Sequence, residues 1–264
     1  MYPPESLILN PNISEEFKEK SRKELQGYYA HATATDEALG NLLAKIKELK
    51  LSENTIIVFS SDHGEMMGAH GVKPFVKQLA WDEAARVPFL ISYPSIGKNK
   101  GQVVNAPLTT PDILPSLLGM TNIEIPKDIE GENLYPAVTN TDRAALIMNV
   151  APFGANFKDE PYRAIRTKQY TYALTPNGPS MFYDNLKDPY QQNNLLNQPE
   201  FSEVQKDLDF KLRKELKKIG DEVRPRDYYL KKWGYTFDEN RRAINFWSWN
   251  EGKGVVQSPK PLSN

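Results

Sequence analysis

Apolar positions in the first fifth of the chain recur at the spacing of an amphipathic helix. The recurrence runs from Glu15 to about Lys50, and Ser14 just before it is a residue type that caps helix N-termini. A helix with one apolar face buries that face against a core. The pattern therefore predicts a long helix whose buried stripe contains Leu25, Tyr29, Ala32, Leu39, Leu43 and Ile46.

Three features of this helix are unusual. Asp36 falls inside the apolar stripe, and an acid on a buried face needs a partner. Structural pairing and a catalytic role both remain open for Asp36. His31 lies beside the stripe and is interpreted as a packing residue. Gly27 and Gly40 lower the helix propensity and allow a break.

A short apolar run follows, Ile56–Phe59, and its β-branched composition suits a strand buried on both faces, as in a parallel sheet. Polar residues come directly after it, including Asp62 and His63. Ligands bind at the carboxyl ends of strands in open α/β sheets, and a carboxylate beside an imidazole suits a cation. Neighbouring side chains can converge only on an irregular turn, which Gly64 permits. The alternative is a strand followed by a polar surface loop.

The next segments continue the alternation of helices and strands. A short helix is predicted at Lys77–Ala85, a second buried strand at Val87–Ile91 and an edge strand at Val103–Leu108. Pro111 suits the first turn of a further helix. Alternating helices and strands indicate the α/β class.

The pattern changes near Asn140. Strands are predicted at Ala144–Val150 and Met181–Tyr183, with a hairpin over 162–174, and an amphipathic helix at Glu200–Ile219. Strands followed by a helix predict a small antiparallel α+β subdomain. The resulting division is 1–140, 141–220 and an aromatic tail, 221–264, packed on the body through Trp233, Trp247 and Trp249.

Composition excludes several kinds of function. The net charge of −1 gives no general electrostatic attraction to nucleic acid or anionic membrane. The chain has no Cys, so it has no disulfide and no thiolate nucleophile or ligand. No apolar segment approaches the length of a membrane span, and the first residues lack the pattern of a signal peptide.

Several of these segments resemble, in order, the second half of a sulfatase catalytic domain in the alkaline-phosphatase-like superfamily. The most specific part is SSDHGEMMGAHG together with the register from Lys77 to Arg86, and TTPDILPSLLGM, YRAIRTKQYTYAL and MFYDNLKDPYQQNNLL add weaker support. The resemblance covers most of residues 1–219. It implies a partial alkaline-phosphatase-like sheet flanked by helices, followed by a small α+β subdomain with an antiparallel sheet.

The resemblance also implies roles for individual residues. Asp62 would be a ligand of a divalent cation, typically calcium, and His63 would lie beside the metal and a sulfate oxygen. Lys77 would bind the sulfate group and offset its developing charge. The loop after Gly71 is about two residues longer than the common family pattern, which makes Lys73 a rival for that role. His70 would contact the ester or its leaving group, or else structure the loop.

Arg86 is interpreted as structural, holding the junction between the short helix and the following strand.

The family's nucleophile motif is missing from this sequence. Sulfatases use a formylglycine made within Cys/Ser-x-Pro-x-Arg, and they complete the metal site with a pair of Asp residues from the first strand. Neither motif occurs here. We therefore expect this chain to be the C-terminal part of a longer enzyme that hydrolyses sulfate esters of a carbohydrate or an aryl alcohol. It would need the N-terminal part of the catalytic domain and would be inactive alone.

Two other functions remain open at this point. Phosphonate and phosphodiester hydrolases of the same superfamily share the Asp-His-Gly element. The chain could also be a non-catalytic module that binds a glycan or protein through Trp247 and Trp249.

Overall fold

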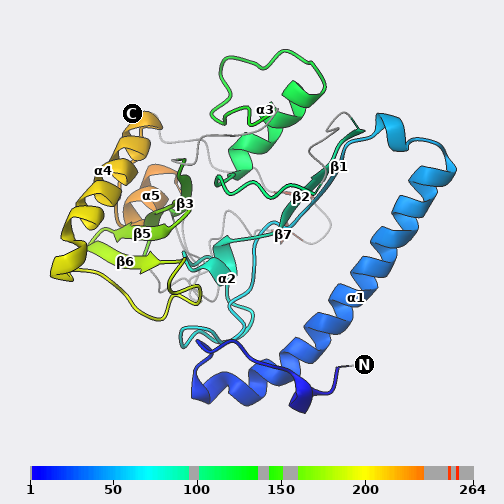
Figure 1. Ribbon diagram of the computed structural model, residues 1–264. Helices are drawn as coiled ribbons and strands as arrows, with labels where there is room; N and C mark the ends of the chain where they lie inside the picture. Colours follow the sequence, from blue (N-terminus) through cyan, green and yellow to red (C-terminus); the bar gives the residue numbers. More distant parts are fainter. Residues whose placement is uncertain are drawn as a thin grey trace. The chain divides into compact units, whose positions relative to one another are not determined.

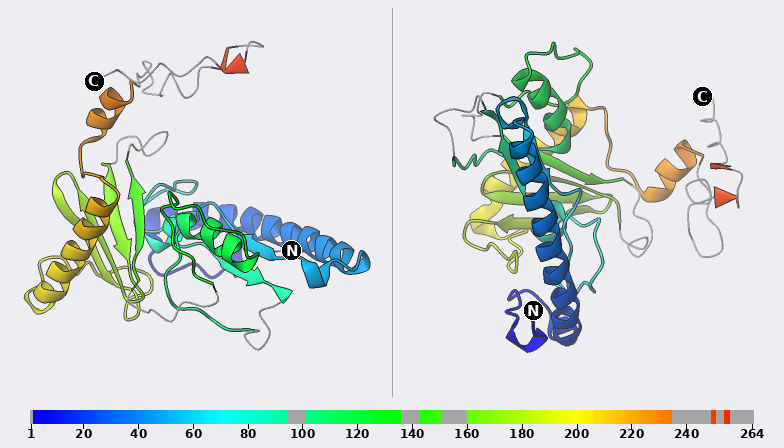
Figure 2. Two further views of the ribbon diagram at one scale, coloured as in Figure 1. Left: turned by 90° about the horizontal axis from the view of Figure 1, so that it is seen from above. Right: turned by 90° about the vertical axis from the view of Figure 1, so that its right-hand side faces the viewer.

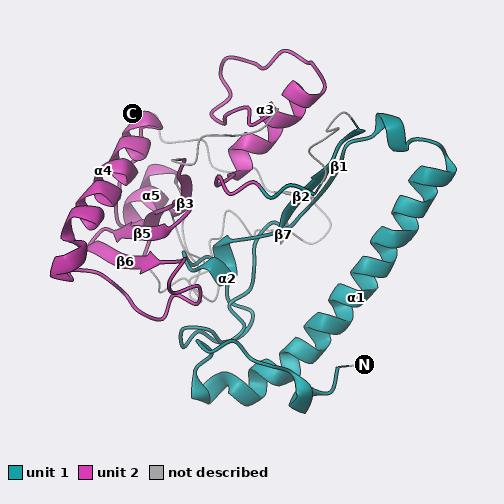
Figure 3. Ribbon diagram, viewed as in Figure 1, with its two compact units in different colours: residues 1–103 teal, residues 104–264 magenta. Residues whose placement is uncertain are grey.

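The computed structural model places two compact units along the chain, residues 1–103 and 104–264 (Figure 3). It describes residues 2–94, 101–135, 143–150, 160–234, 249–250 and 254–255. Over this part of the chain, no helix is both long and apolar enough to cross a membrane. The division into 1–140, 141–220 and 221–264 stays a prediction.

The first unit is dominated by one long helix. Two 3-10 turns, η1 (Pro4–Ser6) and η2 (Glu15–Phe17), precede α1 (Lys18–Glu48), which runs unbroken for 31 residues (Figure 1). Gly27 and Gly40 do not break it, because each lies in helical backbone with open space around it. Ser14 occupies the N-cap of η2 without a side-chain capping bond.

The prediction that the apolar stripe of this helix is buried is wrong for this chain. Ser21 is the single buried residue of α1, while Leu43 remains 39% exposed and Leu42 57% exposed. Asp36 and His31 are also exposed, so neither is a buried packing or pairing residue here. The helical period depends on the sequence alone, whereas burial requires a partner surface.

The strand after the helix forms as predicted, but its environment differs. A turn, η3 (Ser52–Asn54), leads into β1 (Ile57–Ser60), which pairs antiparallel with β2 (Phe89–Ser92) in a two-stranded ribbon. The prediction of parallel strands buried on both faces is wrong within this chain. Apolar β-branched composition predicted the extended backbone correctly, but only neighbouring layers could bury it.

The segments flanking β2 are less regular than predicted. Helix α2 spans only Asp82–Ala85, since Gln78 has a left-handed φ of 78° and Trp81 is extended at its N-cap. Arg86 ends this helix with its side chain 3.8 Å from Asp82 Oδ2, consistent with a structural role. Residues 103–108 form no strand.

The second unit contains a four-stranded antiparallel sheet. Its order is β3 (Ala145–Asn149), β4 (Tyr162–Arg166), β5 (Tyr170–Thr175) and β6 (Gly178–Asp184). After the turn η6 (Pro199–Phe201), α4 (Ser202–Lys218) crosses one face of the sheet, as the left view in Figure 2 shows. Its apolar stripe completes a buried core of Ile165, Tyr172, Leu174, Phe182, Leu208, Leu212 and Leu216.

Two further helices belong to this unit, one before the sheet in the sequence and one after it. Helix α3 (Thr110–Met120) begins with a capping box between Thr109 and Asp112, and α5 (Arg226–Lys232) follows α4. A short ribbon, β7 (Trp249–Asn250) with β8 (Gly254–Val255), lies near the C-terminus. In the predicted aromatic tail, the Trp233 ring lies 5.3 Å from that of Tyr229. Trp247 lies outside the described residues.

Candidate functional site

The acid and imidazole after β1 face one another. The Nε2 atom of His63 lies 3.3 Å from Oδ2 of Asp62, and both side chains are exposed. The backbone N–H of His63 donates to Asp62 Oδ1 at 2.9 Å, and this bond lowers the pKa of the Asp62 carboxyl below its ordinary value. Asp62 is therefore held as a carboxylate, the form that ligates a cation.

Hydrogen bonding also sets the tautomer of His63. Its Nδ1 atom lies 2.8 Å from the carbonyl oxygen of Gly64. A carbonyl only accepts, so Nδ1 carries the proton and, in the neutral ring, Nε2 presents its lone pair toward Asp62. Histidines that bind metals are oriented by such a bond from the other ring nitrogen.

The separation of the Asp62 and His63 side-chain atoms is compatible with a shared cation. Two oxygen or nitrogen atoms at right angles around calcium, each about 2.3–2.6 Å from it, are roughly 3.3–3.7 Å apart. The 3.3 Å separation of Asp62 Oδ2 and His63 Nε2 matches that spacing. Over the part of the chain that the structure describes, however, no group of three or more His, Asp or Glu side chains could hold a metal. The pair would supply only part of a calcium shell, which has six to eight ligands.

The backbone after this pair is fixed to the segment that leads into β2. Gly64 and Glu65 donate their N–H groups to Ala84 O and Glu83 O, at 2.8 and 2.7 Å. A Cβ on Gly64 would lie 2.0 Å from Glu83 O. Glycine is needed here for this close approach, and not only for the irregular turn that the sequence predicted.

Lys77 follows directly after a residue that is hydrogen-bonded to the segment after Asp62. The N–H of Met66 donates to Val76 O at 3.1 Å, so Lys77 follows a residue fixed against the Asp62 segment. Both Lys77 and its rival Lys73 are exposed. Among the described residues, no hydrogen bond or ion pair joins either lysine to Asp62 or His63, and each ammonium group is available to an anion.

The loop that carries both lysines holds uncommon backbone conformations. Four of its residues other than glycine have a left-handed φ, namely Met67, His70, Phe75 and Gln78. Such residues each cost of order 1 kcal/mol or more, and they persist where the surroundings fix them. The buried cluster beneath this loop supplies those surroundings and contains Ile13, Met66, Ala69, Val76 and Ala84.

His70 is enclosed within this loop, with its side chain 9% exposed. Its Nε2 lies 3.3 Å from Glu83 Oε2 and 3.1 Å from Asn12 Nδ2, and its ring stacks on Trp81 with centroids 4.5 Å apart. Asn12 Nδ2 also donates to Glu83 Oε1 at 2.5 Å. His70 thus joins the segment before α1 to helix α2.

Glu83 remains ionised in this enclosed position. Burial raises the pKa of its carboxyl, but the bonds from His70 and Asn12 outweigh burial and bring the pKa below the ordinary value. Sequence reasoning missed Asn12 and Glu83, which are 71 positions apart. No local pattern could have paired them, since each looks like an ordinary polar surface residue.

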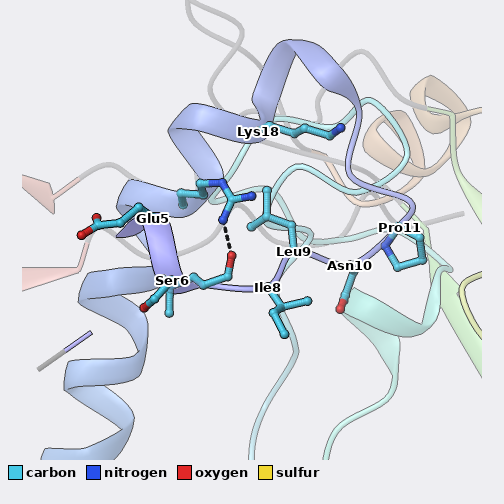
Figure 4. Close-up of a pocket in the computed structure, with 9 residues that line it drawn as sticks. Glu5, Ser6, Ile8, Leu9, Asn10, Pro11 and Lys18 are labelled. Carbon is cyan, nitrogen blue, oxygen red and sulfur yellow. Dashed lines mark hydrogen bonds between the residues drawn. The ribbon is translucent and has the colours of Figure 1, made fainter. Parts of the chain in front are cut away.

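A separate hollow of about 450 Å³ lies at the start of the chain (Figure 4). Residues 5–11 form its rim with Lys18 and Arg22, and the Arg22 guanidinium donates to the backbone oxygens of Leu7 and Pro4. Arg22 therefore holds the N-terminal segment in place. None of Asp62, His63, His70 and Lys77 lines this hollow.

Two protein families match overlapping parts of the chain. The family described as Sulfatase matches residues 9–123, and the family described as N-sulphoglucosamine sulphohydrolase, C-terminal, matches residues 68–218. A curated relative, the ulvan-active sulfatase of Formosa agariphila, is 64% identical over the whole of this chain. The chain spans 52% of that relative's length.

Solved structures show the same similarity. One, determined in complex with its substrate D-glucosamine-2-N,6-O-disulfate, is 27% identical with a TM-score of 0.69, and the match covers 78% of this chain and 43% of that one. The phosphonate monoester hydrolase of Agrobacterium radiobacter shares the fold at 22% identity and a TM-score of 0.67, covering 85% of this chain and 45% of that chain.

Proposed function

Because the chain belongs to the sulfatase family, we propose that it forms the C-terminal part of a metal-dependent enzyme that hydrolyses sulfate esters. The observation that carries this proposal is the Asp62–His63 pair, with ligand atoms 3.3 Å apart at the end of a strand. The preferred substrate class is a sulfated carbohydrate, because one relative is named as an ulvan-active sulfatase and one similar solved structure holds its substrate D-glucosamine-2-N,6-O-disulfate. An aryl sulfate is the other candidate.

In this proposal each residue has a distinct task. Asp62 Oδ2 and His63 Nε2 would hold a divalent cation, calcium by preference, which supplies positive charge beside the sulfate group when bound. Lys77 would bind a sulfate oxygen and stabilise the charge that develops as the S–O bond breaks. His70 would act on the shape of the loop, because its ring is enclosed by Trp81 and tied to Glu83.

The formylglycine and the remaining metal ligands would come from polypeptide outside this sequence. Asp62 and His63 give too few ligands for tight calcium binding. The chain alone should therefore hydrolyse no sulfate ester. Calcium at millimolar concentration should change its melting temperature little, whereas a large increase would contradict the partial site.

Activity should be tested after completing the enzyme. The chain would be joined in frame to the part of the Formosa agariphila relative that it does not match, and hydrolysis of an aryl sulfate and a sulfated glycan would be measured. Asp62→Asn should abolish activity, whereas Asp128→Asn, an exposed control, should not. Lys77→Ala should lower kcat by roughly 10²–10³-fold, and Lys73→Ala should not. The reverse result would transfer the anion-binding role to Lys73.

A phosphonate or phosphodiester hydrolase is the alternative that the shared fold keeps open. The same fusion, assayed side by side, should prefer the sulfate ester. A preference for the phosphonate ester would overturn the assignment of the substrate class.

A further inference from the structure

Phe75 is an exposed aromatic residue in a backbone conformation that phenylalanine rarely adopts. It lies between Lys73 and Lys77 in the loop after Gly71, with a φ angle of 66°, and it is 60% exposed. A left-handed φ is uncommon for residues other than glycine and is an outlier for a bulky side chain. Burial of the side chain does not offset this cost, because more than half of the residue is open to solvent.

The residues on either side of Phe75 hold it in this conformation. Pro74 and Val76 are both buried, whereas Phe75 between them is exposed. Val76 belongs to the buried cluster beneath the loop, and its carbonyl oxygen accepts the N–H of Met66 at 3.1 Å. The backbone is therefore fixed from below, against the segment that follows the candidate cation pair, while the aromatic ring is left on the surface.

The Phe75 ring differs from an ordinary exposed apolar side chain. Among the described residues, no aromatic ring and no cationic group lies against it. Exposed apolar residues are common on protein surfaces, and Phe210, 67% exposed in the helical backbone of α4, is such a case. Phe75 is strained as well as exposed, and strained residues cluster at active sites and at sites that clamp ligands. Aromatic side chains are also frequent in the lining of small-molecule sites.

The two lysines of this loop define which ligand the ring would suit. Lys73 and Lys77 are both exposed, and their Cα atoms are at most about 14 Å apart because four residues separate them. A lysine ammonium group is a point charge on a flexible stem, so both can reach one ligand that lies on the ring between them. A matching ligand has an apolar ring face and anionic groups at two positions. A sugar with two anionic substituents has both features, whereas a simple aryl sulfate has one anionic group.

We propose that Lys73, Phe75 and Lys77 form a substrate subsite that selects a carbohydrate with at least two anionic groups. Lys77 holds the sulfate group that is cleaved, the Phe75 ring stacks on an apolar face of the sugar, and Lys73 pairs with the second anionic group. This inference rests on the proposed function and gives each lysine its own task. Phe75 and Lys73 determine specificity and do not act on the S–O bond.

The test uses the fusion described under the proposed function. Rates are measured with a sulfated ulvan oligosaccharide that carries two anionic groups and with 4-nitrophenyl sulfate, which carries one. Phe75→Gly removes the ring and should raise KM for the oligosaccharide roughly tenfold with little change in kcat, because the ring binds the ground state and the transition state alike. Phe75→Tyr should keep the low KM. Lys73→Ala should lower the ratio of kcat/KM for the oligosaccharide to that for the aryl sulfate by about tenfold.

Matched substitutions elsewhere separate binding from folding. Phe210→Ala and Lys127→Ala change an exposed residue of the same type outside the loop, and both should leave KM for the two substrates unchanged. The melting temperature of Phe75→Gly should equal or exceed that of the unchanged fusion, because glycine adopts a positive φ without strain. A lower melting temperature with an equal loss of kcat for both substrates would show a structural role and overturn the subsite.

Calorimetry with the same oligosaccharide distinguishes the subsite from the proposed function. Binding that Phe75→Gly and Lys73→Ala weaken, while Phe210→Ala does not, supports the subsite even if the fusion cleaves no sulfate ester. Cleavage of the oligosaccharide with a KM that neither Phe75→Gly nor Lys73→Ala changes overturns the subsite and leaves the proposed function in place. If the fusion neither binds nor cleaves the oligosaccharide, the subsite is also overturned.

Discussion

The two units bury their strands in different ways, and the difference shows how far a regular hydrophobic pattern goes toward forming a core. In the second unit, four strands and α4 enclose a core in which Ile165, Phe182 and Leu212 are fully buried. In the first unit, α1 and the β1–β2 ribbon leave large apolar side chains exposed, and the buried apolar side chains lie mainly in the loop cluster around Met66. The second unit is thus stabilised by a core of its own, whereas the helix and the ribbon of the first unit keep large apolar side chains exposed.

Breaking the buried ion pair of the second unit should have the largest effect on the free energy of unfolding. Arg163 is fully buried, and its side chain binds the Asp221 carboxylate and, at 3.0 Å, the Tyr229 hydroxyl. Arg163→Ala should lower the free energy of unfolding by about 3–5 kcal/mol, because it leaves the Asp221 carboxylate without its cationic partner. In urea unfolding, Arg163→Met combined with Asp221→Leu should recover much of the loss, and a single variant with unchanged stability would contradict the role of the pair.

Truncating a side chain in the core between the sheet and α4 should have the second largest effect on stability. Leu212 is fully buried on α4, so Leu212→Ala should cost about 2–5 kcal/mol in urea unfolding. The matched substitution in the first unit is Leu42→Ala, where the side chain is 57% exposed. It should change stability by less than about 0.5 kcal/mol. Equal costs at the two positions would show that α1 is buried in solution and would remove the contrast between the units.

Two glycine-to-alanine substitutions in the first unit should change the free energy of unfolding in opposite directions. In Gly64→Ala the new methyl group would meet Glu83 O, and we expect a loss of about 1–3 kcal/mol from overpacking. Gly40→Ala lies in an open part of α1 and should add up to about 1 kcal/mol through helix propensity. Thermal unfolding of both variants measures the difference, and a harmless Gly64→Ala would mean that the loop does not approach Glu83 so closely.

The smallest expected effect is a pH dependence from Glu83. Its pKa in the folded chain lies below the ordinary value of 4.5. The stabilisation is therefore complete above pH 4.5 and is lost as the pH falls through the folded pKa. The urea midpoint of Glu83→Gln should fall less steeply with acid than that of the unchanged chain. If the urea midpoints of both chains fell equally steeply with acid, the Glu83 carboxylate would not be the source of the pH dependence.

The sequence predicted backbone conformation better than burial. The strands of the second unit lie where the alternation placed them, and α4 presents Leu208, Leu212 and Leu216 to the core as its period required. The helical period of α1 was equally clear, yet its stripe is exposed. Period depends on neighbouring residues alone, whereas burial depends on what lies opposite in the fold.

In the candidate site, too, some features follow from the local sequence and others depend on tertiary contacts. Asp62 and His63 were predictable because they follow a strand directly and are adjacent in the chain. The enclosure of His70 was not, because Asn12 and Glu83 reach it from distant segments.

By itself the sequence determined where most helices and strands form, the absence of thiol chemistry and the position of the acid–imidazole pair. Each of these depends on residue type or on spacing along a few turns of chain. Only the tertiary structure decided that Gly64 is needed for close approach, that His70 is enclosed and that large apolar side chains of α1 and the ribbon are exposed. Those properties depend on which surfaces meet in space, and no local pattern encodes the partner of a surface.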